Sequence, residues 1–218
     1  MVDFDRARQV MVDGQVRAGG ITEPRLLQQF DRVPRENFVP AARRDLAYVD
    51  DLHWFGQPGA SRFMPAPAPL AKLLHLADVR ASDAVLDIGA GTGYATALLS
   101  GLAGAVTGLE EDATLAAAAN TNLAALGLGN ASVVAGDMTH IGADRFDVII
   151  VQGMLDSVPQ EFLDALMEGG RLVALLRSGP IGAANVFVRS GGKVTARIEF
   201  NAFLPPLSGV RKEQDFVF

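Results

Sequence analysis

The residues with the clearest chemical potential form a glycine-rich turn with an acid just before it. The run Val85-Leu86-Asp87-Ile88 is followed by Gly89-Ala90-Gly91-Thr92-Gly93 and then by Tyr94. Glycine adopts backbone angles closed to other residues and lets a ligand approach the main chain closely, so the turn predicts a ligand-binding loop. Asp87 adds a negative charge directly before the loop, which favours a cationic group in the ligand.

Two phosphate-binding motifs fit this turn poorly. A dinucleotide fingerprint would place its third glycine at position 94, where the chain has Tyr94, and Gly93 comes one position too early. A P-loop would need Gly-Lys followed by Ser or Thr, and Asp87 would repel a pyrophosphate. S-adenosylmethionine carries an ammonium and a sulfonium but no phosphate. We therefore predict S-adenosylmethionine as the cofactor.

Two further acids follow apolar runs that resemble strands. Glu110, after Val106-Thr107-Gly108-Leu109, can accept hydrogen bonds from both ribose hydroxyls. Asp137 can accept one from the adenine amino group while Met138 packs on the ring. An acid at such a place is often only a helix N-cap, so the order and spacing of all three acids carry the prediction. The residues predicted to bind the cofactor are Asp87, Gly89, Ala90, Gly91, Gly93, Glu110, Asp137 and Met138.

From residue 84 onward, the pattern alternates between strands and helices. Strands are predicted at residues 84–88, 105–109, 131–135, 146–151 and 171–176. Helices are predicted at residues 94–102, 113–126 and 159–167, the last closed by Gly169-Gly170. This alternation is typical of an α/β fold with a mostly parallel, doubly wound sheet. Residues 186–189 and 194–200, joined by Ser190-Gly191-Gly192, predict a terminal antiparallel hairpin.

The first 80 residues predict a helical extension. One helix runs to about Arg17 before Gly19-Gly20, a second follows Thr22 and ends near Val33-Pro34, and a third occupies residues 70–76. Residues 38–69 form a long irregular stretch, a kind of segment that is usually functional or mobile. We therefore divide the chain into an extension and substrate loop, residues 1–80, and a cofactor-binding core, residues 81–218, in one compact unit.

Composition excludes several classes of function. The 218 residues are 49% hydrophobic and 20% charged, with a formal net charge of −6, which argues against general nucleic-acid binding. No cysteine is present, which rules out disulfides and thiolate chemistry, and no metal-ligand spacing joins the three histidines. The uncharged stretches 88–109 and 113–136 are broken by glycine and polar residues, so no membrane span is expected. We expect a cytoplasmic monomer.

Several motifs resemble the protein-L-isoaspartate O-methyltransferase family along most of the chain. The N-terminal matches are Met11-Val12-Asp13-Gly14-Gln15-Val16-Arg17, Gly20-Ile21-Thr22, Arg32-Val33-Pro34-Arg35-Glu36-Asn37-Phe38-Val39-Pro40 and Leu46-Ala47-Tyr48 with Asp50. Residues 87–94 are similar to the family's cofactor loop, and Phe203-Leu204-Pro205-Pro206-Leu207 to its C-terminal strand. The cofactor loop occurs in many methyltransferases, so the N-terminal matches are the more diagnostic ones.

The resemblance implies a class I methyltransferase fold and a substrate. The family methylates the α-carboxylate of L-isoaspartyl residues in damaged proteins or peptides, and the ester collapses to a succinimide that partly hydrolyses to normal aspartate. The family's active-site segment, Gly-Gln-Thr-Ile-Ser-Gln-Pro, aligns with Gly59-Ala60-Ser61-Arg62-Phe63-Met64-Pro65. Ser61 keeps the hydroxyl of the family's Thr and is the implied catalytic residue. Arg62, Phe63 and Pro65 are the implied substrate-binding residues.

The same segment leaves three functions open. Phe63 and Met64 stand where the family has Ser and Gln, which makes the acceptor pocket more apolar. The chain is expected to be an isoaspartyl carboxyl methyltransferase. The alternatives are a paralogue with a different acceptor and a non-catalytic protein that binds S-adenosylmethionine. Arg62 suits an acceptor carboxylate, although a solvated loop charge fits equally well.

Overall fold

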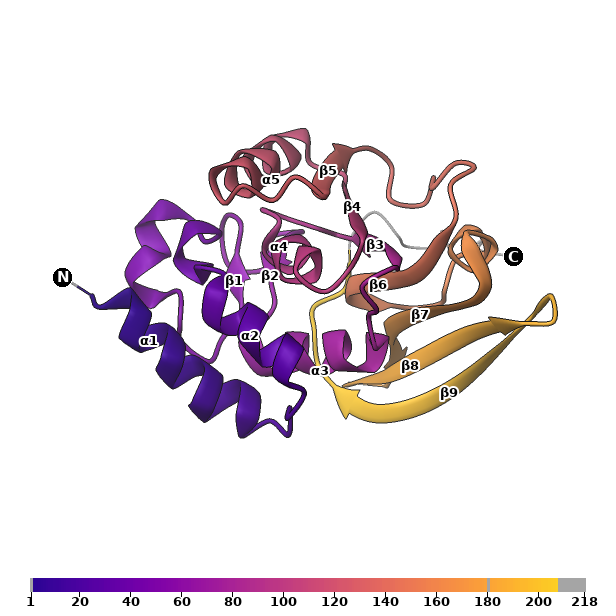
Figure 1. Ribbon diagram of the computed structural model, residues 1–218, viewed down its shortest axis with the longest axis horizontal. Helices are drawn as coiled ribbons and strands as arrows, with labels where there is room; N and C mark the ends of the chain where they lie inside the picture. Colours follow the sequence, from indigo (N-terminus) through magenta and orange to yellow (C-terminus); the bar gives the residue numbers. More distant parts are fainter. Residues whose placement is uncertain (1, 180, 208–218) are drawn as a thin grey trace, which may run out of the picture.

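A seven-stranded sheet in the order β5-β4-β3-β6-β7-β8-β9 forms the centre of the molecule (Figure 1). The computed structural model describes residues 2–179 and 181–207. The strands are β3 (Ala84–Ile88), β4 (Ala105–Glu110), β5 (Ala131–Ala135), β6 (Phe146–Leu155), β7 (Leu166–Ser178), β8 (Ile181–Ser190) and β9 (Lys193–Ala202). Strands β3 to β7 pair in parallel, while β8 and β9 are antiparallel. The predicted fold class is confirmed.

Helices cover both faces of the sheet. Alternate residues of β3 point to opposite sides, so Val85 joins one hydrophobic cluster while Leu86 and Ile88 join another. The first cluster lies under α3 (Pro67–Ala77), α4 (Tyr94–Ser100) and α5 (Ala113–Ala125), and the second under α6 (Gln160–Asp164). Among the described residues, no helix has the length and apolar character needed to cross a membrane.

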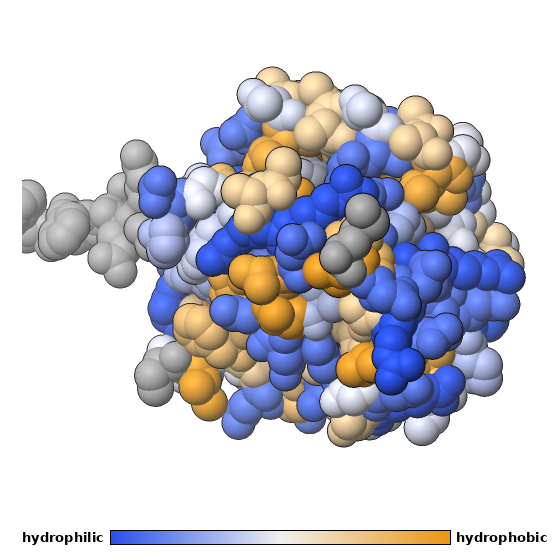
Figure 2. All heavy atoms as spheres, turned by 90° about the vertical axis from the view of Figure 1, so that its left-hand side faces the viewer, coloured by the Kyte–Doolittle hydropathy of each residue, from blue (hydrophilic) through white to orange (hydrophobic). Residues whose placement is uncertain are grey.

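The N-terminal extension packs beside the sheet and shares its larger hydrophobic cluster. It contains α1 (Phe4–Met11), the π-helical η1 (Val12–Arg17), α2 (Pro24–Arg32) and the 3₁₀ segments η2 (Arg35–Asn37) and η3 (Ala41–Leu46). A small hairpin, β1 (His53–Trp54) with β2 (Phe63–Met64), completes it. The face seen in Figure 2 is largely hydrophilic, with separate small hydrophobic areas.

Chain order places a crevice at the carboxyl ends of β3, β4 and β6. The chain passes from β3 outward through β4 to β5 and then returns to place β6 on the other side of β3. Ligands of open α/β sheets bind where the strand order reverses in this way. The glycine turn follows β3 at this point, and Glu110 is the last residue of β4.

Several element boundaries differ from the sequence prediction, most clearly around β7. The helix predicted at 159–167 covers only Gln160–Asp164, and Gly169-Gly170 lies inside β7. A Cβ at Gly170 would come within 2.8 Å of the Met167 carbonyl oxygen and 3.0 Å of that of Phe146. These contacts accompany a register shift between β6 and β7, so the glycine marks an irregular strand rather than a helix end.

The other differences lie in long loops. The stretch 38–69 contains η3 and the β1–β2 hairpin, and α3 begins at Pro67, where proline suits the first helical turn. Residues 203–207 form a single bridge between Met154 and Pro206 rather than a strand. Proline has no backbone N–H, which limits pairing there. The segment still hydrogen-bonds to β6, since the Met154 N–H donates to the Pro205 carbonyl and the Leu207 N–H donates to the Met154 carbonyl.

Candidate active site

The glycine loop is a tight turn covered by two segments that are distant in sequence. Gly89, Gly91 and Gly93 have φ values of +82°, +55° and +89°, in the region that favours glycine. A Cβ at Gly91 would lie 2.6 Å from the ring of Phe55, and one at Gly89 would lie 2.9 Å from Leu207 Cδ1. The loop can therefore approach a ligand closely, beneath a cover that comes from two distant segments.

Asp87 is fully buried below the loop. Its Oδ1 accepts a hydrogen bond of 2.7 Å from Gln152 Nε2, and its Oδ2 accepts one of 2.6 Å from Thr96 Oγ1. Burial raises the pKa of Asp87 to about 6, against the lowering effect of these two hydrogen bonds, and the charge of Glu110 raises it further. Both hydrogen-bond partners are neutral, so the carboxylate suits a cationic ligand group. Direct contact between Asp87 and the cofactor stays a prediction.

Glu110 is buried at the end of β4 and faces the glycine loop. Its Oε2 accepts a hydrogen bond of 2.7 Å from the Gly91 backbone N–H. Its Oε1 accepts one of 3.0 Å from the Asp112 N–H and an ion-paired bond of 2.7 Å from Arg62 Nε. The acid predicted to bind the ribose is thus joined to the loop and to the active-site segment.

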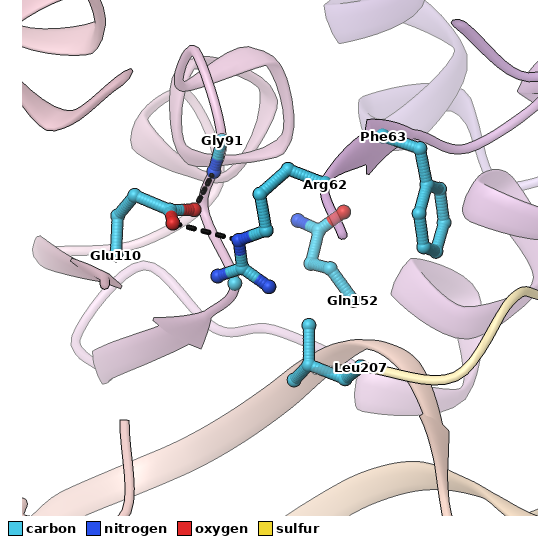
Figure 3. Close-up of a pocket in the computed structure, with 7 residues that line it drawn as sticks. Arg62, Phe63, Gly91, Glu110, Gln152 and Leu207 are labelled. Carbon is cyan, nitrogen blue, oxygen red and sulfur yellow. Dashed lines mark hydrogen bonds and ion pairs between the residues drawn. The ribbon is translucent and has the colours of Figure 1, made fainter. Parts of the chain in front are cut away.

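Arg62 and Phe63 bring the active-site segment onto the cofactor loop. In Figure 3 Arg62 points between Glu110 and Gln152, and Phe63 lies on the far side of Gln152. Both side chains are buried and line one small cavity with Gly89, Gly91 and Leu207, which these side chains fill almost completely. Phe63 also contacts Trp54 edge to face, with ring centroids 5.5 Å apart. The structure therefore brings together Arg62, Phe63, the loop and Glu110.

A second small cavity, with only about 10 Å³ open to water, lies beside the first. Its apolar lining includes Phe55, Phe63, Met64, Pro65 and Leu70, and it also touches the glycine loop and Gln152. An apolar lining with a few polar groups is typical of ligand sites, and these side chains would have to move apart to admit a ligand. It is a candidate site for the acceptor side chain.

Of the three other predicted site residues, two are exposed and one contacts Arg62. Ser61 is exposed, next to Arg62 in the segment. Asp137 is exposed, and its Oδ1 accepts hydrogen bonds from the N–H and hydroxyl of Thr139, which lower its pKa. Met138 is buried, with its Sδ 2.8 Å from Arg62 Nη2. The roles predicted for these residues stay predictions.

Two buried polar residues were missed by sequence reasoning. Gln152 bonds to Asp87 and lines both cavities. Arg35 is wholly buried and donates to the carbonyls of Ala47, at 2.8 Å, and Pro65, at 2.7 Å. Gln152 was signalled only by its place within an apolar run, and Arg35 only by its place within a motif that resembles the family.

The residues present fit S-adenosylmethionine. Glu110 offers carboxylate oxygens to hydroxyl groups, Asp87 offers charge to a cation, and the glycine turn permits close approach. No group of three or more His, Cys, Asp or Glu side chains with metal-binding geometry occurs within residues 2–179 and 181–207.

Comparison with known proteins identifies the family. Residues 6–210 match the model of the family described as "Protein-L-isoaspartate(D-aspartate) O-methyltransferase (PCMT)". A protein-L-isoaspartate O-methyltransferase of Koribacter versatilis (strain Ellin345) is 38% identical, covering 88% of this chain and 85% of the relative. One of Rhodopseudomonas palustris (strain ATCC BAA-98 / CGA009) is 41% identical, covering 79% and 77%.

Solved structures agree on the fold. A Plasmodium falciparum beta-aspartate methyltransferase (PCMT), crystallised with S-adenosyl-L-homocysteine, has a TM-score of 0.79 at 18% identity, covering 96% of this chain and all of that one. The family match spans nearly the whole chain, including the segment around Arg62. The chain belongs to the protein-L-isoaspartate(D-aspartate) O-methyltransferase family and is an S-adenosylmethionine-dependent methyltransferase.

Proposed function

We propose that this chain methylates the α-carboxylate of L-isoaspartyl residues in damaged proteins or peptides. One observation carries the proposal: the segment aligned with the family's active site contributes Phe63 to a cavity that also includes Gly89 and Glu110. The expected cofactor and acceptor sites therefore adjoin. Family membership and the similarity to protein-L-isoaspartate O-methyltransferases support the same substrate.

The chain's residues act by binding, orienting and excluding water. S-adenosylmethionine, when bound, supplies a methyl group already activated by a sulfonium. An acceptor carboxylate is ionised at neutral pH, so no residue needs to act as a general base. Phe55, Phe63 and Leu207 shield the glycine loop, and such shielding strengthens electrostatic contacts and holds reactants in line.

A different acceptor is the second candidate. Phe63 and Met64 are buried in the apolar cavity where the family's segment has Ser and Gln. This lining supports a carboxylate carried next to an apolar group. The buried Asp87 and Glu110 count against a purely non-catalytic role, since a protein without transfer chemistry would have less need of them.

The test is methyl transfer from labelled S-adenosylmethionine to an L-isoaspartyl peptide, with the matching L-aspartyl peptide as control. We expect label only in the isoaspartyl peptide. No transfer, with cofactor binding confirmed in the same preparation, would remove this acceptor. A screen of peptides with apolar residues beside the carboxylate would then test the second candidate.

We also propose that the enzyme acts as a cytoplasmic monomer that binds neither nucleic acid nor membranes. The net charge of −6 and the absence of cysteine support this setting. The largely hydrophilic face in Figure 2 supports a free surface there. Light scattering after size exclusion should give a mass near 23.0 kDa, and a multiple of that mass would contradict the monomer.

A further inference from the structure

Arg62 holds the carboxylate that the cofactor ribose would need. Its side chain is only 6% exposed, and its Nε lies 2.7 Å from Glu110 Oε1. Its Nη2 lies 2.8 Å from Met138 Sδ, the side chain predicted to pack on adenine. Figure 3 shows the contact between Arg62 Nε and the Glu110 carboxylate. A cation thus lies across the two positions assigned to adenosine.

Glu110 can accept few further hydrogen bonds. One oxygen accepts from the Gly91 N–H and the other from the Asp112 N–H as well as from Arg62. A carboxylate has about four acceptor sites. The space around these side chains leaves about 0 Å³ open to water, whereas ligand pockets usually enclose about 300–1,000 Å³. A ribose diol and the guanidinium cannot both pair with Glu110 in this space.

We propose that Arg62 is a displaceable occupant of the ribose position, and that cofactor binding breaks the Arg62–Glu110 ion pair. This inference rests on the proposed function, because it takes Glu110 as the ribose acceptor. Two backbone features favour a side-chain movement over an opening of the whole hairpin. The Phe55 N–H donates to the Arg62 carbonyl at 3.0 Å, and β1 pairs with β2 through Trp54 and Phe63.

Displacement gives Arg62 a second use. Its backbone is fixed beside Ser61 and Phe63, so a released guanidinium stays within the active-site segment. There it can pair with an acceptor carboxylate, since arginine forms charge-assisted bonds to carboxylates. Binding then follows an order in which the cofactor takes Glu110 and the acceptor takes Arg62.

The test measures S-adenosyl-L-homocysteine affinity by calorimetry for the wild type, Arg62→Met and Arg62→Lys. Arg62→Met keeps the length of the side chain but removes the charge that competes for Glu110. We expect about tenfold tighter binding for Arg62→Met, and an intermediate gain for Arg62→Lys. The control is Arg171→Met, which removes an arginine paired with Asp83 before β3, at the opposite end of the sheet. It should leave the affinity unchanged.

Steady-state kinetics distinguish displacement of Arg62 from a purely structural role of this residue. In Arg62→Met, the KM for the isoaspartyl peptide should rise about tenfold, while the affinity for S-adenosyl-L-homocysteine increases. Unchanged or weaker S-adenosyl-L-homocysteine binding by Arg62→Met would overturn the inference, because Arg62 would then be neutral or a cofactor ligand. Failure of the wild type to bind would overturn the proposed function and this inference with it. Wild-type binding and methylation without the gain would overturn this inference alone.

A second measurement covers the case in which Arg62→Met fails to fold. Trp54 is the only tryptophan and contacts Phe63, so its fluorescence reports on the segment. In stopped-flow mixing, the wild-type association rate should reach a plateau at high S-adenosyl-L-homocysteine, set by release of Arg62. A rate that rises linearly throughout would contradict the displacement step.

Discussion

The cofactor side and the acceptor side of this site meet in one crevice but are held by different means. The cofactor side is specified by local backbone: three glycines with positive φ, directly between a buried strand and a helix. The acceptor side is a hairpin of two-residue strands whose position depends on side chains from elsewhere in the chain. The first can persist while residues of the second change, as at Phe63 and Met64.

Besides the Arg62–Glu110 ion pair, Arg35 links the acceptor side to the rest of the fold. Besides its bonds to the Ala47 and Pro65 carbonyls, its guanidinium lies 4.9 Å from the centre of the Tyr94 ring, at the start of α4. One side chain thus connects the extension, the active-site segment and the helix that follows the glycine loop. If the two sides are built independently, variants should affect one and spare the other.

The largest effect is expected from Asp87→Asn on the cofactor side. Loss of the negative charge should weaken S-adenosyl-L-homocysteine binding about 100-fold, within the range for a hydrogen bond to a charged group. The fold should gain stability. The folded pKa of about 6 exceeds the ordinary value of 3.8, so Asp87 stabilises the fold below pH 4 and loses this contribution as pH rises through 6.

Because Asn resembles the protonated form, the variant should be more stable at pH 8 by about 3 kcal/mol, from 1.36 kcal/mol per pKa unit. Calorimetry and urea unfolding at pH 5 and pH 8 provide the check. Equal stability of wild type and variant at both pH values would contradict the raised pKa. Unchanged affinity would remove Asp87 from the cofactor site.

Arg35→Met tests the acceptor side. Two buried carbonyls lose their donor, so we expect the free energy of unfolding to fall by about 2–4 kcal/mol. The catalytic efficiency with an isoaspartyl peptide should fall about 30-fold, while S-adenosyl-L-homocysteine affinity stays within about threefold. Arg35→Lys, which keeps the charge, should recover part of the activity. Equal losses of affinity and turnover would show that the two sides are not independent.

The pH dependence of cofactor binding is the next effect in size. Affinity for S-adenosyl-L-homocysteine should fall about tenfold between pH 7 and pH 5, since protonation of Asp87, with its pKa near 6, removes the charge that holds the ligand. Calorimetry at intervals across this range measures the profile. In Asp87→Asn the same profile should be flat, and a slope that persists there would assign the titration to another group.

Phe63→Ser restores the residue type of the family's segment. A hydroxyl in the apolar cavity adds one hydrogen bond to an acceptor carboxylate, so we expect about a fivefold gain in catalytic efficiency with an isoaspartyl peptide. The loss of the Trp54 contact and of buried area should lower stability by about 3 kcal/mol. Lower efficiency at a temperature where the variant is folded would favour the alternative acceptor.

The contrast between the two sides also explains what the sequence could predict. The glycine loop and most core strands were predictable, because glycine angles and buried apolar runs leave direct traces in the order of residues. The position of Glu110 beside the glycine loop was predictable because Glu110 ends the strand β4. These features depend on neighbours in sequence, so one chain is enough to find them.

The partners of buried polar side chains could not be predicted in the same way. Arg62 and Glu110 are 48 residues apart, and a two-residue strand such as Phe63–Met64 is too short to show which way its neighbours point. The sequence around Arg35 and Gln152 did not show that these two polar side chains would be buried. Gly169-Gly170 was wrongly predicted to end a helix. Both a helix end and an irregular strand favour glycine, because glycine adopts backbone angles that other residues avoid.

The smallest expected effect is that of Asp137→Ala, which tests the outer edge of the cofactor side. Asp137 is exposed and already accepts two bonds from Thr139, so a bond to the adenine amino group would compete with water and with that turn. We therefore expect S-adenosyl-L-homocysteine to bind about threefold more weakly, as measured by calorimetry beside the wild type. An unchanged affinity would indicate that adenine is bound by Met138 and the apolar surface alone. The charged contacts of the cofactor would then be limited to the buried residues Asp87 and Glu110.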